Sequence, residues 1–286
     1  MPKQFWFIFA EMNGEVRNKK ISILGCGWLG LPLAKKLVAK GWQVKGSTTT
    51  AEKLELLEET GIDPFLIDVE TGKEQYNPHF FDSDFLMLNI PPGHKKKPNF
   101  YLSKMQSLLP YIEASSIRKV IFVSSTSVYG DVCREVTEAD EPDIHSELLQ
   151  AEMLFLSAKN LQTTVVRFGG LFGPNRNPGR FFRDKNSIPN GLAPVNLIHL
   201  QDCLGLIEAV LDQQKFPAVY NAVAPSHPTK KEFYTKAIIK SGFAVPDFTE
   251  EKTVWKIINP KKTIVDLDYR FQYPDLLGCL DDPNAF

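Results

Sequence analysis

The sequence lacks the features of several enzyme classes. Its four cysteines form no Cys-x-x-Cys pair, and none of its five histidines has a close partner at metal-site spacing. No Gly-x-Ser-x-Gly element occurs, so metal-dependent hydrolysis and serine-esterase chemistry have no support. The widely spaced cysteines fit reduced, mostly buried thiols, which predicts a cytoplasmic protein without a metal.

The chain also has little net charge and no long apolar run. Its formal net charge is −1, which argues against a nucleic-acid or anionic-membrane surface. The apolar segment 5–10 is far too short to span a membrane. Residues 1–18 are interpreted as an appendage, either a short packing arm or a segment upstream of a true start at Met12. The expected partner is a small-molecule substrate, and the oligomeric state stays open.

A glycine-rich stretch follows the first predicted strand. The apolar run Ile21–Leu24 leads directly into Gly25-x-Gly27-x-x-Gly30, and a helical pattern then continues to Gly41. This order of strand, glycine turn and helix is typical of a unit that binds a dinucleotide. Gly25 permits the tight turn, Gly27 permits close approach of a pyrophosphate, and Gly30 permits close packing of helix on strand.

The backbone of this glycine loop is expected to bind phosphate. The amide groups of Trp28 and Leu29 precede the helix, and the positive end of the helix dipole attracts anions there. We therefore predict that Gly25, Gly27, Trp28, Leu29 and Gly30 all contact the cofactor.

Further buried strands alternate with helical segments along the chain. Apolar runs predict strands at 42–44, 65–68, 85–90, 119–123 and 163–168. This alternation favours an α/β fold with a Rossmann-type, doubly wound parallel sheet. We expect a dinucleotide-binding domain over residues 19–174, and a smaller substrate-binding region over 175–286 that is interleaved with the last elements of that fold.

The end of the second strand bears on the choice of cofactor. An NAD-specific fold places an acid there for the ribose 2′-hydroxyl, but residues 46–50 contain glycine, serine and threonine only. Thr48, Thr49 and the nearby Lys53 suit a 2′-phosphate at least as well, which favours NADP over NAD. Asp68 is either an adenine contact or an ordinary turn residue. Asn89, in the run 85–90, is also predicted to contact the cofactor.

Polar clusters follow the later strands. Ser124 and Ser125 begin a hydroxyl-rich segment where open α/β sheets place ligand contacts, although such residues also cap helices and turns. The basic run 94–97 would face an anionic ligand or form a solvated loop. Arg176, Arg180 and Arg183 form either a substrate clamp or a surface loop. Asp202 is expected to cap a helix that begins near residue 201.

Several of these segments together resemble the short-chain dehydrogenase/reductase superfamily, in its extended and atypical branch of NAD(P)-dependent epimerase/dehydratase-like proteins. The resemblance implies a Rossmann core, a nicotinamide cofactor and a catalytic role for Ser125, while the hydroxyl cluster at the strand end predicts a cofactor contact by Ser124. The segments that carry it are residues 25–30, 124–131, 167–174, 177–182 and 195–202.

The chain departs from this family at the proton donor. The family uses a tyrosine followed four residues later by a lysine, which lowers the tyrosine pKa. None of the eight tyrosines here has a lysine at that spacing. Tyr129 and His145 are the candidate replacements. The glycine spacing also differs, because the extended branch usually has GxxGxxG.

Two functions remain open from the sequence. One is an atypical NAD(P)-dependent oxidoreductase or epimerase-like enzyme acting on a small substrate. The arginines of residues 176–183 suggest that this substrate is phosphorylated or nucleotide-linked. The other is a non-catalytic dinucleotide sensor or regulatory scaffold.

Overall fold

The computed structural model describes residues 19–69, 76–93 and 99–286. The predictions for the appendage 1–18 and for the basic run 94–97 lie outside these residues.

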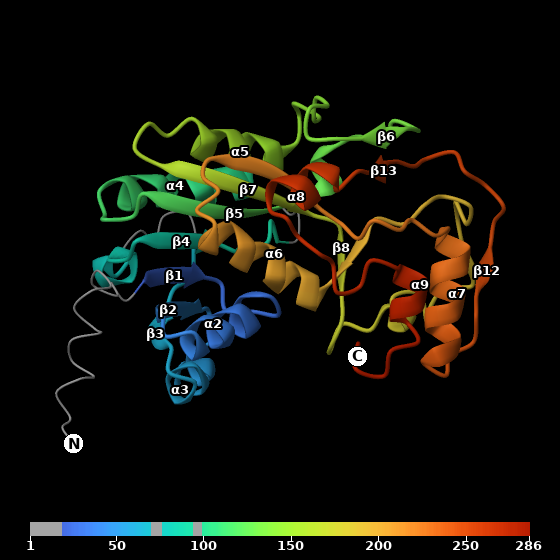
Figure 1. Cartoon of the computed structure of the whole chain (residues 1–286), viewed down its shortest axis with the longest axis horizontal. Coiled ribbons are helices and arrows are strands. Elements are labelled where there is room, and N and C mark those ends of the chain that lie inside the picture. The colour runs from blue at the N-terminus through green and yellow to red at the C-terminus, as the bar shows by residue number, and fades with distance from the viewer. Residues whose placement is uncertain (1–18, 70–75, 94–98) are drawn as a thin grey trace, which may run out of the picture.

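A parallel sheet of seven strands forms the centre of the described chain (Figure 1). Its strand order is β11-β7-β5-β4-β1-β2-β3, and every neighbouring pair is parallel. The order reverses between β1 and β4, which is where doubly wound sheets bind ligands. This confirms the predicted Rossmann-type α/β fold. The strands are β1 (Lys20–Leu24), β2 (Gln43–Thr48), β3 (Asp63–Leu66), β4 (Phe85–Leu88), β5 (Lys119–Ser125), β7 (Gln162–Phe168) and β11 (Ala218–Ala222).

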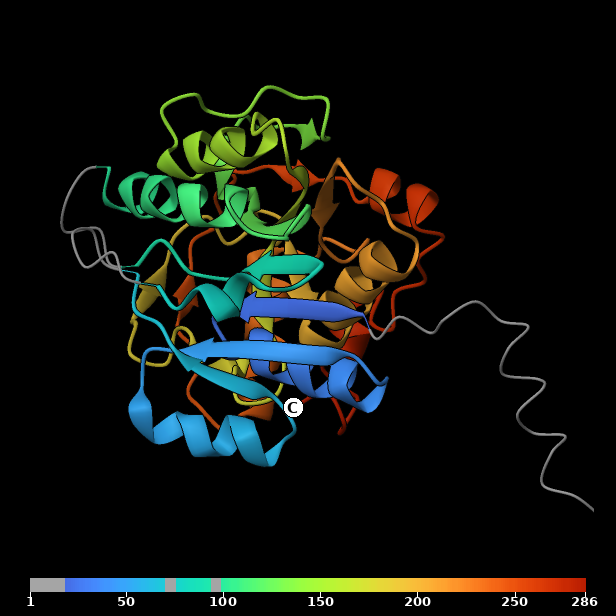
Figure 2. The ribbon, with the colours of Figure 1, turned by 90° about the vertical axis from the view of Figure 1, so that its left-hand side faces the viewer.

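Helices cover both faces of this sheet. On one face, α2 (Gly30–Ala39), α3 (Leu54–Glu59) and α6 (Leu200–Asp212) contribute to a core that includes Ile21 and Ile23 of β1. On the other face, α4 (Phe100–Glu113) and α5 (Glu147–Leu156) pack together over a second core (Figures 1 and 2). Burial of apolar residues on both faces explains why the central strands read as continuous apolar runs.

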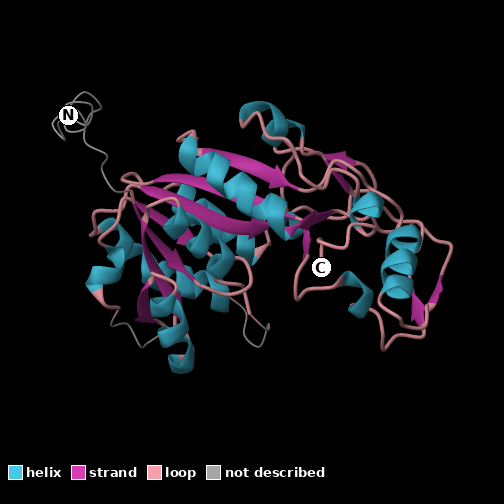
Figure 3. Ribbon diagram, turned by 60° about the horizontal axis from the view of Figure 1, so that its bottom comes forward, coloured by secondary structure: helices cyan, strands magenta, loops and turns pink. Residues whose placement is uncertain are grey.

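The elements beyond the sheet form a smaller region with its own apolar core (Figures 1 and 3). Phe172, Phe233 and Leu276 are fully buried in this core. Two short parallel pairs contribute to it, namely β8 (Gly170–Phe172) with β10 (Leu197–His199) and β9 (Ser187–Ile188) with β12 (Asp247–Phe248). A third pair, β6 (Glu135–Val136) with β13 (Ile257–Ile258), belongs to the core under α4 and α5. The helices of the smaller region include α7 (Lys230–Lys240) and α9 (Leu276–Cys279), whereas α8 (Lys261–Asp266) packs against β11.

Strand bounds differ from the sequence prediction at the ends that matter for the site. β2 continues to Thr48, whereas the apolar run ended at residue 44. β5 continues to Ser125, whereas its apolar run ended at residue 123. Polar residues extend both strands because the parallel neighbours still supply backbone partners there.

The predicted capping role of Asp202 is wrong. His199 caps α6, because its Nδ1 accepts a hydrogen bond from Gln201 N at 3.1 Å. Asp202 is fully buried and accepts hydrogen bonds from Gln272 N at 2.6 Å and Tyr273 N at 3.0 Å. It therefore holds the C-terminal segment against α6.

Two further absences concern the described residues. Within them, no helix combines the length and the hydropathy that a membrane crossing requires. Nor do they contain a cluster of histidine, cysteine, aspartate or glutamate that could bind a metal ion.

Candidate dinucleotide site

Two glycines of the loop between β1 and α2 leave no room for a side chain. Gly25 has φ +110°, and a Cβ there would lie 2.5 Å from Asn89 O. A Cβ on Gly30 would lie 2.2 Å from Gly25 O. Gly27 is different, because its Cβ would meet no atom within 4 Å. Gly25 and Gly30 are therefore required by packing, whereas Gly27 faces open space where a phosphate could approach.

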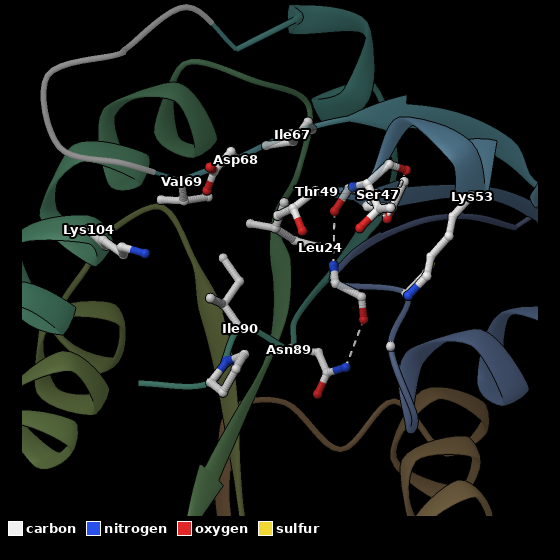
Figure 4. Close-up of a pocket in the computed structure, with 16 residues that line it drawn as sticks. Leu24, Ser47, Thr49, Lys53, Ile67, Asp68, Val69, Asn89, Ile90 and Lys104 are labelled. Carbon is white, nitrogen blue, oxygen red and sulfur yellow. Dashed lines mark hydrogen bonds between the residues drawn. The ribbon is translucent and has the colours of Figure 1, made fainter. Parts of the chain in front are cut away.

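Two polar side chains hold this loop in place. Ser47 Oγ accepts a hydrogen bond from Gly25 N at 2.9 Å. Asn89 Nδ2 donates to Gly25 O at 2.8 Å (Figure 4). Asn89, predicted as a direct cofactor contact, thus orders the glycine loop and still lines the adjoining pocket.

A pocket of about 320 Å³ opens beside the glycine loop. This volume lies within the range of small-molecule sites. Lys53 lies on the Ser47 side, whereas Asp68 and Lys104 lie on the opposite side (Figure 4). The pocket thus gathers residues from the carboxyl ends of β1, β2, β3 and β4. Predicted cofactor residues that line it are Gly25, Gly27, Thr48, Thr49, Asp68 and Asn89.

Trp28 and Leu29 lie next to this pocket at the start of α2. Leu29 is buried in the core. The half-buried indole of Trp28 donates from Nε1 to Pro174 O at 2.7 Å. The side chains of both residues therefore pack against protein, and their backbone amides remain the groups predicted to bind phosphate.

The serines at the end of β5 point to different partners. Ser124 is buried, and its hydroxyl donates to Glu152 Oε1. Ser125 is half-buried, and its Oγ accepts from Ser127 N at 3.1 Å, which caps the 3-10 turn η3 (Thr126–Val128). Neither serine is among the residues that line the pocket. While its hydroxyl donates to Glu152, Ser124 could contact a cofactor only as an acceptor.

Glu152 and Arg167 form a buried ion pair that the sequence analysis did not identify. Arg167 Nη2 lies 2.6 Å from Glu152 Oε2, and Arg167 Nε lies 3.1 Å from both carboxylate oxygens. Both side chains are almost completely buried, since that of Arg167 is 5% exposed and that of Glu152 is 0% exposed. Two features of the sequence could have indicated this pair. Arg167 is a charged residue inside the apolar strand 163–168, and Glu152 lies beside Ala151 on the apolar face of a helix.

Tyr129 belongs to the same buried network. Its hydroxyl accepts from Arg167 Nη1 at 2.7 Å and donates to Asn221 Oδ1 at 3.1 Å. Burial raises the pKa of Tyr129 above its ordinary value, although the charge of Arg167 acts in the opposite direction. A tyrosine acid near neutral pH needs a lowered pKa, so this environment does not favour the predicted proton transfer.

His145 and the arginine-rich loop lie at the surface. His145 is exposed just before α5, and its backbone N–H donates to Asp143 Oδ1 at 2.9 Å. All three predicted substrate arginines are exposed. Arg183 Nε lies 3.2 Å from Asp184 Oδ2, and Arg176 lies with its Cζ 5.5 Å from the ring centroid of Trp28. Arg180 ends the 3-10 turn η4 (Pro178–Arg180).

Comparison with known proteins identifies the family. The sequence model of the NAD(P)H-binding family matches residues 25–194. Protein YeeZ of Escherichia coli strain K12 is 37% identical over 273 residues, which cover 91% of this chain and 98% of YeeZ. The chain belongs to the NAD(P)H-binding family.

Solved structures similar to this NAD(P)H-binding protein include epimerase-like proteins. A putative NAD-dependent epimerase/dehydratase from Methylobacillus flagellatus superposes with TM-score 0.71 at 25% identity, covering 91% of this chain and 96% of that one. UDP-glucuronic acid 4-epimerase from Bacillus cereus, in complex with NAD, superposes with TM-score 0.74 at 19% identity, covering 92% and 96%. The similarity to UDP-glucuronic acid 4-epimerase shows a shared fold alone.

Proposed function

We propose that this protein binds NADP in preference to NAD and uses it in an oxidoreductase or epimerase-like reaction. The observation that carries the cofactor preference is the end of β2, where Thr48, Thr49 and Lys53 line the pocket and no carboxylate occurs. Asp68 lies on the opposite side of the pocket from Lys53 (Figure 4). A cation at the ribose end suits a 2′-phosphate, whereas a carboxylate there would repel it.

The pocket residues fit the parts of such a cofactor. Open space at Gly27 leaves room for the pyrophosphate, which the amides of Trp28 and Leu29 would bind. Asp68 would accept a hydrogen bond from the adenine amino group. Thr48 Oγ1 already accepts from Thr50 N at 3.1 Å, so the exposed Thr49 is the freer hydroxyl for the ribose phosphate.

The reactive end would lie beyond β4 and β5. A bound nicotinamide ring would supply or accept the hydride. Ser125 would donate a hydrogen bond to the reacting substrate oxygen, because its Oγ only accepts in its bond with Ser127 N. For the proton, His145 has no side-chain partner among the described residues, whereas the Tyr129 hydroxyl is bound by Arg167 and Asn221. We therefore favour His145 over Tyr129.

The substrate we propose is anionic, as a phosphorylated or nucleotide-linked small molecule. The exposed Arg180 ends η4 in the loop after β8 and carries a fork suited to phosphate. Several solved structures of this fold are described as complexes with UDP-glucuronic acid or UDP-glucose and NAD. We also propose a cytoplasmic location on the basis of the unpaired cysteines.

A sensor without catalysis is the second candidate function. It is favoured by the missing tyrosine–lysine pair and by the engagement of Tyr129 in a buried ion-pair network. Hydride transfer from bound NADPH to any substrate would exclude it. If such turnover is found, Ser125→Ala should abolish most of it without loss of nucleotide affinity.

The cofactor preference can be tested by titrating wild-type and Lys53→Ala protein with NADPH and NADH. Loss of one charge-assisted contact should weaken NADPH binding about tenfold and leave NADH binding unchanged. Lys104→Ala is the matched control, since it removes a pocket lysine from the opposite side and should affect both nucleotides equally. Preferential binding of NADH by the wild type would contradict the proposal.

A further inference from the structure

The loop after β8 is attached to the glycine loop. Trp28 Nε1 donates to Pro174 O at 2.7 Å. The chain then makes a tight turn, in which Arg176 N donates to Gly173 O at 2.9 Å and Asn175 has φ +62°. The turn 173–176 therefore has a fixed position relative to Trp28.

This turn places Arg176 over the indole of Trp28. The guanidinium carbon lies 5.5 Å from the ring centroid, and the side chain is exposed. Within the described residues Arg176 forms no ion pair, in contrast to Arg167 with Glu152 and Arg183 with Asp184. An arginine stacked on an aromatic ring keeps its N–H edge free for an anion.

A dinucleotide brings two negative charges to the glycine loop. The backbone amides and the dipole of α2 offer only partial positive charge there. Of the lysines that line the pocket, Lys53 lies on the Ser47 side, which is the proposed ribose end, and Lys104 lies on the opposite side (Figure 4). Trp28, whose amide is expected to bind the pyrophosphate, is also the residue on which Arg176 stacks.

We propose that Arg176 is a ligand of the cofactor pyrophosphate, on the nicotinamide side, instead of a substrate residue. This inference rests on the proposed dinucleotide binding and assigns to it a contact from outside the first βαβ unit. The stack on Trp28 would restrict Arg176 before the cofactor arrives, which lowers the entropy cost of the contact.

The test compares three ligands that share adenosine 2′,5′-bisphosphate. They are NADP⁺, 2′-phospho-ADP-ribose, which retains the pyrophosphate without nicotinamide, and adenosine 2′,5′-bisphosphate itself. Calorimetric titration of Arg176→Ala should show about tenfold weaker binding of the first two and less than about twofold for the third. Arg118→Ala, an exposed arginine just before the amino end of β5 and so at the opposite edge of the sheet, is the control and should leave all three affinities unchanged.

Each other outcome has a separate meaning. Unchanged NADP⁺ affinity in Arg176→Ala, beside a wild type that binds, would overturn the inference and leave the proposed function intact. A loss seen with NADP⁺ but not with 2′-phospho-ADP-ribose would also overturn it, since the contact would then be to nicotinamide. Failure of the wild type to bind NADP⁺ or NAD⁺ would overturn the proposed function itself.

Discussion

Two strand ends at the same edge of the sheet use similar polar residues in opposite ways. At the end of β2, Thr49 is exposed beside an open pocket, and Ser47 holds the glycine loop. At the end of β5, the hydroxyls of Ser124 and Tyr129 are buried and bonded to a Glu152–Arg167 ion pair. The difference shows that a hydroxyl cluster after a strand is not by itself a ligand site. Whether a hydroxyl is available to a ligand depends on whether it is already hydrogen-bonded to a buried charged side chain.

The largest expected effect comes from a substitution in the buried network at the end of β5. Glu152→Ala would leave the Arg167 charge buried without its partner, and it should destabilise the protein by about 3–5 kcal/mol. Chemical denaturation measures the change. Lys231→Met, which removes the exposed pair with Glu250 at 3.0 Å, is the control and should cost less than about 1 kcal/mol. A small loss in Glu152→Ala would show that the network does not stabilise the fold.

A substitution in the glycine loop beside the open pocket should affect both protein stability and nucleotide binding. In Gly30→Ala the added Cβ would lie 2.2 Å from Gly25 O, so the loop must shift. Overpacking of this kind typically costs about 1–3 kcal/mol, and the displaced amides should bind nucleotide poorly. Thermal unfolding and NADPH titration measure the two effects. Normal affinity in a stable Gly30→Ala protein would contradict this role of Gly30.

A substitution at Tyr129 distinguishes a structural from a catalytic hydroxyl. Tyr129→Phe removes the acceptor of Arg167 Nη1 and should destabilise the protein by about 1–3 kcal/mol, since a charged donor is left unpaired. Nucleotide affinity should stay unchanged. A variant of normal stability would instead point to a hydroxyl retained for chemistry.

A smaller effect is expected at His199, away from both strand ends. Burial lowers the pKa of His199, and its Nδ1 accepts the capping bond from Gln201 N. Protonation is therefore less favourable in the folded state, so stability should fall as pH drops below about 6.5. The loss is at most about 1.4 kcal/mol per pH unit. His199→Asn keeps a capping group and should reduce this slope, although the half-buried His227, whose pKa burial also lowers, would retain part of it. The exposed His145→Asn should not change it.

Much of the fold and several residues of the candidate dinucleotide site could be predicted from local sequence patterns. The run Ile21–Leu24 and the glycine spacing place the first strand, the loop and α2 correctly, because each depends on neighbouring residues only. The absence of an acid from residues 46–50 was visible for the same reason.

The rest depends on contacts between distant residues. Ser124 and Ser125 point to different partners because β5 continues through both and side chains alternate along a strand. The apolar run ended too early to show this alternation. Asp202 binds the backbone of Gln272 and Tyr273, which are 70 and 71 residues away, so no local pattern could indicate it.

Titration of Gly27→Asp beside the wild type, with NADPH and NADH, tests the central claim most directly. Open space around the Gly27 Cβ should let the variant fold normally, while its carboxylate would repel the pyrophosphate. Gly130→Asp, an exposed glycine that does not line the pocket, is the matched control. We predict tight NADPH binding by the wild type and by Gly130→Asp, and its loss in a folded Gly27→Asp protein. Equal binding by Gly27→Asp, or no binding of either nucleotide by the wild type, would contradict a dinucleotide site at this loop.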